Sequence, residues 1–390
     1  MKNHHPRDVE HPSQKYNPSQ INPTYFASYS EHFPHIGFLT DESNAIRELT
    51  EVHHLIFGLC HHKFEPPFKK GSHYGKPRLQ ITPLGKSLLR FLGNIPELKA
   101  RFPHHELQPM MTEAIRLAEE FSPAVSLDDL RHACGQEIDA VVKEYSDWAI
   151  QMRQAALSNG MYEKVKSFRR NGTRNYKQAM ACMKQAQERH KQVLLKRLDW
   201  SPRKKDPLTP VEKMSEDEFL AAFNYIANAR KLMTKRLRKT FKEDLFFYVW
   251  KIEFGPIKGF HIHWLIGLNG AKYWDRINVG FHIAKDWDKN IFNNTSHTHN
   301  VNALPTREAV GLKLVHYADP DAGYYFGHHA DYLSKVDYSM RLRLPKGRHA
   351  FGCTKLKKPS KNKTGPARRY EISTYDVHAV RGPQGGKKQR

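Results

Sequence analysis

Two dense apolar runs joined by a short turn constrain this chain more than any other feature. The first run is LFFYVWKIEF (residues 245–254), the second is FHIHWLIGL (260–268), and GPIKG (255–259) joins them. Aromatic and β-branched residues favour strands, whereas Gly and Pro favour turns. Because a short loop can join only antiparallel strands, the sequence predicts a hairpin of two buried strands.

Signals on both sides of this hairpin define the predicted fold class. A helix over residues 215–239 is amphipathic and opens with a capping box formed by Ser215 and Glu218. In chain order the predicted elements are a strand (192–200), this helix, the hairpin, a second helix (282–292), a further strand (310–318) and a third helix (328–338). We therefore predict an α+β domain whose antiparallel sheet carries helices on its face or faces.

This domain is expected to occupy residues 192–359, and composition divides the rest of the chain. Residues 1–38, rich in Pro, Asn, Ser and His, are typical of a disordered leader. Residues 39–191 show helical periodicity but no motif for chemistry, so we expect a mainly helical region that positions the domain or reads DNA. Residues 360–390 should form a basic, flexible tail.

Charge narrows the class of partner. The net charge of +23, from 63 Lys and Arg against 40 Asp and Glu, favours a polyanion. No apolar run is long enough to span a membrane, so we expect nucleic acid and no membrane. Residues 339–390 hold 15 basic residues and two acids, which either contact phosphates or only solvate the tail. Four scattered cysteines and the absence of an N-terminal apolar segment favour a cytoplasmic protein.

Two His-x-His pairs occur, and 24 histidines in 390 residues make about one or two such pairs expected by chance. His261 and His263 lie on a predicted strand, where residues i and i+2 share a face, so their imidazoles can share a metal ion. His297 and His299 lie in the polar segment NNTSHTHNVN, which we predict to be a solvated loop.

Glu253 offers a third ligand. It lies at the end of the first hairpin strand, and the short turn brings it near His261. A buried carboxylate is unfavourable unless it is paired or bound to a metal. One carboxylate beside two imidazoles suits Mg²⁺ or Mn²⁺. The alternative is an exposed Glu253 at the strand edge that pairs with Lys258.

The pattern Glu253…His261-Ile262-His263 between apolar flanks resembles the metal-binding motif of the HUH endonucleases, a class of replication initiators, relaxases and transposases. That class also carries a nucleophilic tyrosine on a downstream helix, commonly as Tyr-x-x-Lys, and DYLSK supplies Tyr332 and Lys335. Over residues 192–359 the chain is similar to inovirus-type, filamentous-phage gene-two-like replication proteins, the YagK/YfjJ C-terminal domain family. The helical region before them is not covered by the resemblance.

The resemblance implies a phage or prophage rolling-circle replication initiator that acts in the cytoplasm of a bacterial host. Glu253, His261 and His263 would hold Mg²⁺ or Mn²⁺. Tyr332, assisted by Lys335, would attack single-stranded origin DNA and form a 5′-phosphotyrosine. No second tyrosine lies one helical turn from Tyr332, which implies a single-tyrosine enzyme. A host polymerase would extend the free 3′-OH, and a host helicase would unwind DNA, since no Walker A motif occurs.

Alternatives stay open at this point. The chain could be a non-catalytic DNA-binding or regulatory protein, or a relaxase or transposase that uses the same site. Tyr332 could be an ordinary helical residue, in which case Tyr338 is the next candidate nucleophile. We expect His316 to be a strand residue rather than a fourth ligand, and Trp250 and Trp264 to pack in the core.

Overall fold

The structure is a computed structural model that describes most of the chain between residues 52 and 356. The described residues are 52, 55–56, 58–60, 64–126, 129–203, 214–255, 259–275, 277–303 and 311–356, without the side chains of Arg131 and Lys335. The predicted leader and tail lie outside them. The chain divides into two compact units, Met1–Pro103 with Leu107–Arg169 and His104–Glu106 with Arg170–Arg390. The division falls within helix α6 (Asn159–Arg189), whereas the sequence analysis placed the domain boundary at residue 192.

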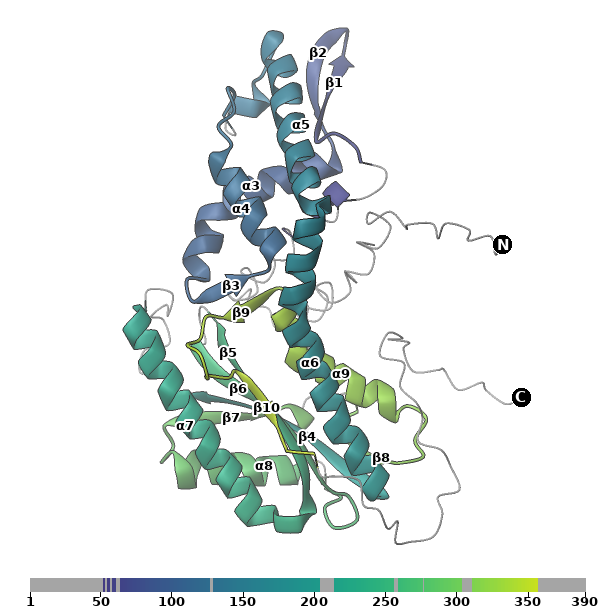
Figure 1. Ribbon diagram of the computed structural model, residues 1–390, viewed down its shortest axis with the longest axis vertical. Coiled ribbons are helices and arrows are strands. Elements are labelled where there is room, and N and C mark those ends of the chain that lie inside the picture. The colour runs from purple at the N-terminus through teal and green to yellow at the C-terminus, as the bar shows by residue number, and fades with distance from the viewer. Residues whose placement is uncertain are drawn as a thin grey trace, which may run out of the picture. The chain divides into compact units, whose positions relative to one another are not determined.

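The second unit is built on a six-stranded antiparallel sheet (Figure 1). The strand order is β10-β5-β6-β4-β7, and β8 also pairs with β4. The strands are β4 (Gln192–Pro202), β5 (Leu245–Gly255), β6 (Gly259–Asn269), β7 (Ser296–Asn300), β8 (Leu314–His316) and β10 (Phe351–Cys353). The β5–β6 hairpin is confirmed, with Phe254 opposite Phe260 and Gly255 opposite Gly259. Gly259 has φ 67°, a backbone conformation that favours glycine where the second strand begins.

Helices cover both faces of this sheet, which confirms the α+β prediction (Figure 1). On one face lie α7 (Glu216–Phe241), α8 (Asn278–Lys285) and the π-helical turn η6 (Asp286–Ile291). On the other lie the second part of α6 and α9 (Ala322–Ser334). Because side chains alternate along each strand, Leu194, Trp200 and Trp264 pack toward α7, whereas Leu195, Val249 and Leu265 pack toward α6 and α9. Each such burial contributes about 1.5–3 kcal/mol.

A local sequence signal sets the start of α7. The predicted capping box of α7 is confirmed, since Ser215 Oγ accepts from Glu218 N at 3.3 Å and Glu218 Oε2 accepts from Ser215 N at 2.8 Å. After α9 the chain continues as the 3₁₀ helix η9 (Lys335–Tyr338) and strand β9 (Met340–Leu342), which pairs with β3 (His105–Leu107).

The first unit combines helices with a β-hairpin. Its helices are α3 (Pro83–Arg101), α4 (Pro109–Glu120), the 3₁₀ turn η3 (Asp129–Arg131) and α5 (Gln136–Leu157), and its strands are β1 (Phe68–His73) and β2 (Lys76–Ile81). Helix α5 starts at Gln136, because Gly135, with φ 53°, interrupts the chain, and Ser126 caps only the preceding turn η3. The hairpin was not predicted.

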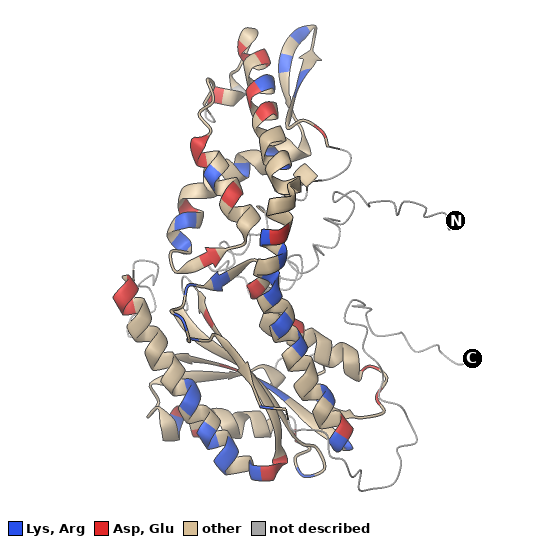
Figure 2. Ribbon diagram, in the orientation of Figure 1, with Lys and Arg blue, Asp and Glu red and all other residues tan. Residues whose placement is uncertain are grey.

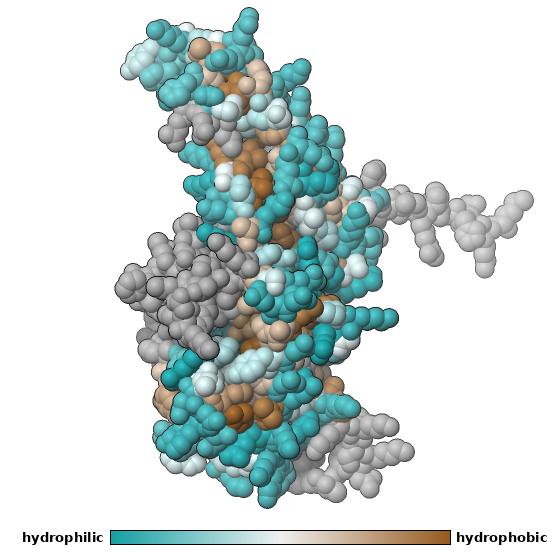
Figure 3. Space-filling model, turned by 90° about the vertical axis from the view of Figure 1, so that its left-hand side faces the viewer, coloured by the Kyte–Doolittle hydropathy of each residue, from teal (hydrophilic) through white to brown (hydrophobic). Residues whose placement is uncertain are grey.

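None of the helices in the described part of the chain is both long and apolar enough to cross a membrane. On the face that Figure 3 presents, apolar side chains gather in small patches among hydrophilic ones.

Candidate metal centre

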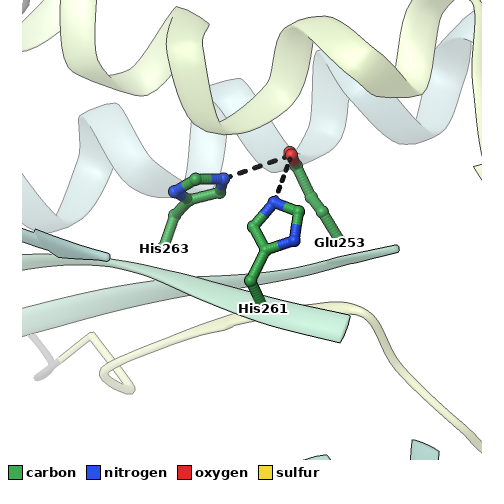
Figure 4. Close-up of side chains that lie close together, drawn as sticks. All are labelled: Glu253, His261 and His263. Carbon is green, nitrogen blue, oxygen red and sulfur yellow. Dashed lines mark hydrogen bonds and ion pairs between the residues drawn. The ribbon is translucent and has the colours of Figure 1, made fainter. Parts of the chain in front are cut away.

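The β5–β6 hairpin brings the three predicted ligands together. Glu253 on β5 lies directly opposite His261 on β6, and His263 is two residues further along the same face. One ligand atom from each of the three residues lies within 4.8 Å of the other two (Figure 4). The exposed-edge alternative for Glu253 is not supported, because its side chain is only 13% exposed. Lys258 lies outside the described residues.

Both imidazoles point their Nε2 atom toward Glu253. Nε2 of His263 lies 3.2 Å from Glu253 Oε2, and Nε2 of His261 lies 3.5 Å from the same oxygen (Figure 4). The other ring nitrogens face acceptors outside the cluster. His261 Nδ1 is 3.1 Å from the carbonyl oxygen of Gly259, and His263 Nδ1 is 2.8 Å from Asp199 Oδ1. Outer acceptors of this kind fix the ring orientation and tautomer of metal-binding histidines.

Asp199, which the sequence analysis did not select, belongs to the same site. It lies on β4 opposite His263. Its carboxylate accepts two hydrogen bonds from Arg197, from Nε at 3.3 Å and from Nη2 at 2.9 Å. The sequence carried a signal that could have identified Asp199. Arg197 and Asp199 interrupt the apolar strand QVLLKRLDW with charges, just as Glu253 interrupts β5.

These contacts shift the ionisation of the buried groups. Burial alone would lower the pKa of His263, but the carboxylates of Asp199 and Glu253 outweigh burial and raise it to about 9. Burial alone would raise the pKa of Glu253, yet His263 and His261 hold it well below its usual value. Burial likewise opposes ionisation of Asp199, and Arg197 and His263 hold its pKa below its usual range. At neutral pH the site therefore pairs two carboxylates with a protonated His263 and Arg197.

The donor set fits a divalent metal ion. Two imidazole nitrogens and one carboxylate form an N₂O set that a borderline ion such as Mn²⁺ accepts. Oε1 of Glu253 is buried and has no hydrogen-bond partner among the described residues, so one carboxylate oxygen is available to an ion. A metal ion would take the place of the proton on His263.

Tyr332 lies beside this cluster, on α9 as expected. Its ring stands edge-on to the imidazole of His263, with centroids 5.2 Å apart and an interplanar angle of 89°. The Arg197 guanidinium carbon lies 3.5 Å from the centre of the Tyr332 ring. The helix ends at Ser334, so Lys335 begins η9, and its side chain lies outside the described part of the structure.

The other candidates lie apart from the cluster. The ring of Tyr338 lies against Gly172 of α6. His316 is a β8 residue that accepts a hydrogen bond from Ala318 N at 3.2 Å, as expected for a strand histidine. Trp250 and Trp264 are buried in the core, which confirms their predicted role.

The prediction of a loop around His297 and His299 was wrong. These residues lie on the edge strand β7, in a pattern that alternates buried and exposed residues. Ser296 and Thr298 face inward, where Asp288 accepts hydrogen bonds from both hydroxyls at 2.6 and 2.8 Å and fixes the strand. His299 pairs with Asp199 across the sheet, so both β7 histidines face the same side as His263 and are solvent-exposed, as expected.

Comparisons with known proteins give one match. The family model described as the YagK/YfjJ C-terminal domain matches residues 158–354. Neither the curated proteins nor the solved structures include a significant match.

Proposed function

Since the chain belongs to the YagK/YfjJ C-terminal domain family, we propose that its second unit is an HUH-type, inovirus-like endonuclease that nicks and rejoins single-stranded origin DNA. One observation carries the proposal, namely that Tyr332 packs against His263 within the cluster of Glu253, His261 and His263. A tyrosine of an ordinary helix surface has no reason to meet a metal-type donor set.

The reaction is a transesterification at phosphorus. The phenol oxygen of Tyr332 forms a bond to the scissile phosphorus while the bond to the 3′ oxygen breaks, which leaves a 5′-phosphotyrosine and a 3′-OH. The proton lost by the phenol is balanced by the proton gained by the 3′ oxygen. Mg²⁺ or Mn²⁺ held by Glu253, His261 and His263 would act as a Lewis acid that polarises the phosphate. The covalent intermediate retains the phosphodiester energy, so rejoining needs no ATP.

Arg197 is a further cation that can assist Tyr332, in addition to Lys335 and the metal ion. A tyrosine with pKa ~10 is mostly protonated at neutral pH, so a nearby cation favours the nucleophilic phenolate. The Arg197 guanidinium lies against the Tyr332 ring and is held by Asp199, which also faces His263. Asp199 therefore orients both His263, a proposed metal ligand, and Arg197, the cation beside the proposed nucleophile Tyr332.

The exposed β7 histidines extend the same face of the sheet toward its edge. We place the incoming single strand along this face, where solvent-exposed imidazoles can donate hydrogen bonds to phosphates. Rolling-circle replication in a bacterial host would then require a polymerase for the 3′-OH and a helicase as partners. Cytoplasmic action belongs to the same proposal.

A covalent-adduct assay tests the proposal. Labelled single-stranded DNA that carries the element's origin is incubated with the full chain and Mn²⁺, and adducts are resolved by denaturing electrophoresis. We expect an adduct that EDTA abolishes and that is absent from Tyr332→Phe. Tyr338→Phe is the matched control and should keep the adduct.

Three outcomes would contradict the proposal. An adduct that persists in Tyr332→Phe and disappears in Tyr338→Phe would identify another nucleophile. An adduct that forms in EDTA would exclude the metal. DNA binding without an adduct on any strand would support a non-catalytic DNA-binding or regulatory protein.

A further inference from the structure

The β1–β2 hairpin of the first unit is anchored only at its base. Phe68, at the start of β1, is fully buried and lies edge-on to Tyr145 of α5, with ring centroids 4.9 Å apart. Lys70 donates to Asp139 of α5 at 2.8 Å. Beyond these contacts no residue of either strand is buried, and Tyr74 at the tip is 93% exposed. The distal part of the hairpin therefore contributes little to the core.

The two faces of this hairpin differ in character. The pairing places Lys69 opposite Gln80, Gly71 opposite Arg78, and His73 opposite Lys76. These six residues share one face, whereas Phe68, Lys70 and Ile81 point to the face that packs on α5. Because Gly71 has no side chain, nothing across the strand competes with the Arg78 guanidinium for space.

The outward face is basic and lacks acidic residues. Three of its six residues are Lys or Arg, namely Lys69, Lys76 and Arg78, and the whole segment FKKGSHYGKPRLQI contains no Asp or Glu. Figure 2 shows both strands with blue and no red, whereas α5 beside them carries both colours. Lys69 pairs with Glu65, but Lys76 and Arg78 form no ion pair with any described residue. Two cations and the exposed Tyr74 thus remain available at the distal end.

The tip has a defined geometry. Tyr74 and Gly75 form a two-residue turn with φ values of 51° and 76°, which matches the right-handed twist of the flanking strands. The His73 and Tyr74 rings meet edge to face, 4.3 Å between centroids. Each strand of six residues is about 20 Å long, and two strands lie about 5 Å apart. A two-stranded ribbon of this width fits the major groove of B-DNA, which is about 12 Å wide.

We propose that the outward face of the β1–β2 hairpin binds double-stranded DNA by entering the major groove, with Lys76 and Arg78 on the flanking phosphates and Tyr74 at the groove floor. This gives the first unit a duplex-binding role that is separate from the proposed chemistry on single strands. The inference does not depend on the metal centre, because it rests on the hairpin alone.

Fluorescence anisotropy with the full chain in EDTA and a labelled 20-base-pair duplex tests the proposal. We expect Lys76→Ala/Arg78→Ala to bind at least about tenfold more weakly and to reduce the slope of log K against log salt by about 1.8, since each lost phosphate contact removes about 0.9. Tyr74→Ala should weaken binding without changing that slope. The charge-matched control is Lys86→Ala/Lys143→Ala, which removes two exposed lysines elsewhere in the first unit.

Thermal melting of each variant confirms folding, and the single-strand adduct assay is run in parallel. Unchanged duplex affinity and salt slope in Lys76→Ala/Arg78→Ala would overturn the proposal, as would an equal loss in the control. A loss confined to single-stranded DNA or RNA would overturn it too. A failed adduct assay with the duplex effect intact would count against the proposed endonuclease only.

Discussion

Metal binding at the cluster should depend steeply on pH, because His263 must lose a proton first. With its pKa raised to about 9 by Asp199 and Glu253, about 99% of the metal-free protein carries this proton at pH 7. Below pH 9, each unit decrease in pH should weaken the apparent Mn²⁺ affinity about tenfold. Between pH 8 and 6.5 the dissociation constant should therefore rise about 30-fold. Isothermal titration calorimetry in two buffers of different ionisation enthalpy should show about one proton released per Mn²⁺.

The raised pKa of His263 should also make the stability of the metal-free protein, measured in EDTA, depend on pH. A raised histidine pKa stabilises the folded state. This stabilisation is complete below the unfolded-state pKa of about 6.5 and is lost as pH rises toward 9. Two and a half pKa units correspond to about 3 kcal/mol of unfolding free energy. Asp199→Asn removes one of the charges that raise the pKa and should flatten the affinity profile, whereas His297→Gln on exposed β7 should not. A pH-independent affinity without proton release would refute His263 as a ligand.

Three further variants follow from contacts in the second unit. Glu253→Gln should weaken Mn²⁺ binding at least about 100-fold by calorimetry, since it removes the only carboxylate of the donor set, and retained affinity would place the metal elsewhere. Lys251→Ala removes the ion-pair partner of buried Asp337, which retains the hydrogen bond from Asn175 Nδ2 at 2.7 Å, and should lower the unfolding free energy by about 3–5 kcal/mol in urea, with adduct yield measured alongside. Gly267→Ala would place a Cβ 2.2 Å from the Phe247 ring and should cost about 1–3 kcal/mol; an unchanged urea midpoint would contradict this reasoning.

The parts of the site that the sequence predicted are close together in the chain. Glu253 and His261 are separated by one turn, so the hairpin alone specifies that they face each other. The capping box of α7 is equally local, because both of its hydrogen bonds join Ser215 to Glu218. Local patterns of this kind need no knowledge of the strand order.

Asp199 and Arg197 could not be assigned in the same way. Their place beside His263 depends on β4 lying next to β6 in the sheet, a pairing of strands about 60 residues apart. The sequence showed that the charges interrupt an apolar strand but not which strand would lie alongside.

The β1–β2 hairpin was missed for a different reason. In β1 only Phe68 is apolar, and in β2 the alternation is limited to Leu79 and Ile81 at its end, so neither strand carries the extended pattern that marks a half-buried sheet.

The two His-x-His pairs show how far a local pattern can decide function. Both pairs lie on strands and face the same side of one sheet, so alternation alone does not distinguish them. The difference lies in the position of each strand in the sheet. β6 is an inner strand, and Nε2 of His261 and Nε2 of His263 both lie within 3.5 Å of the same carboxylate oxygen of Glu253. β7 is an edge strand, and its two histidines are solvent-exposed even though His299 lies opposite Asp199. A carboxylate across the strand is therefore not enough to gather two imidazoles into a donor set, and we expect metal binding only at the pair on β6.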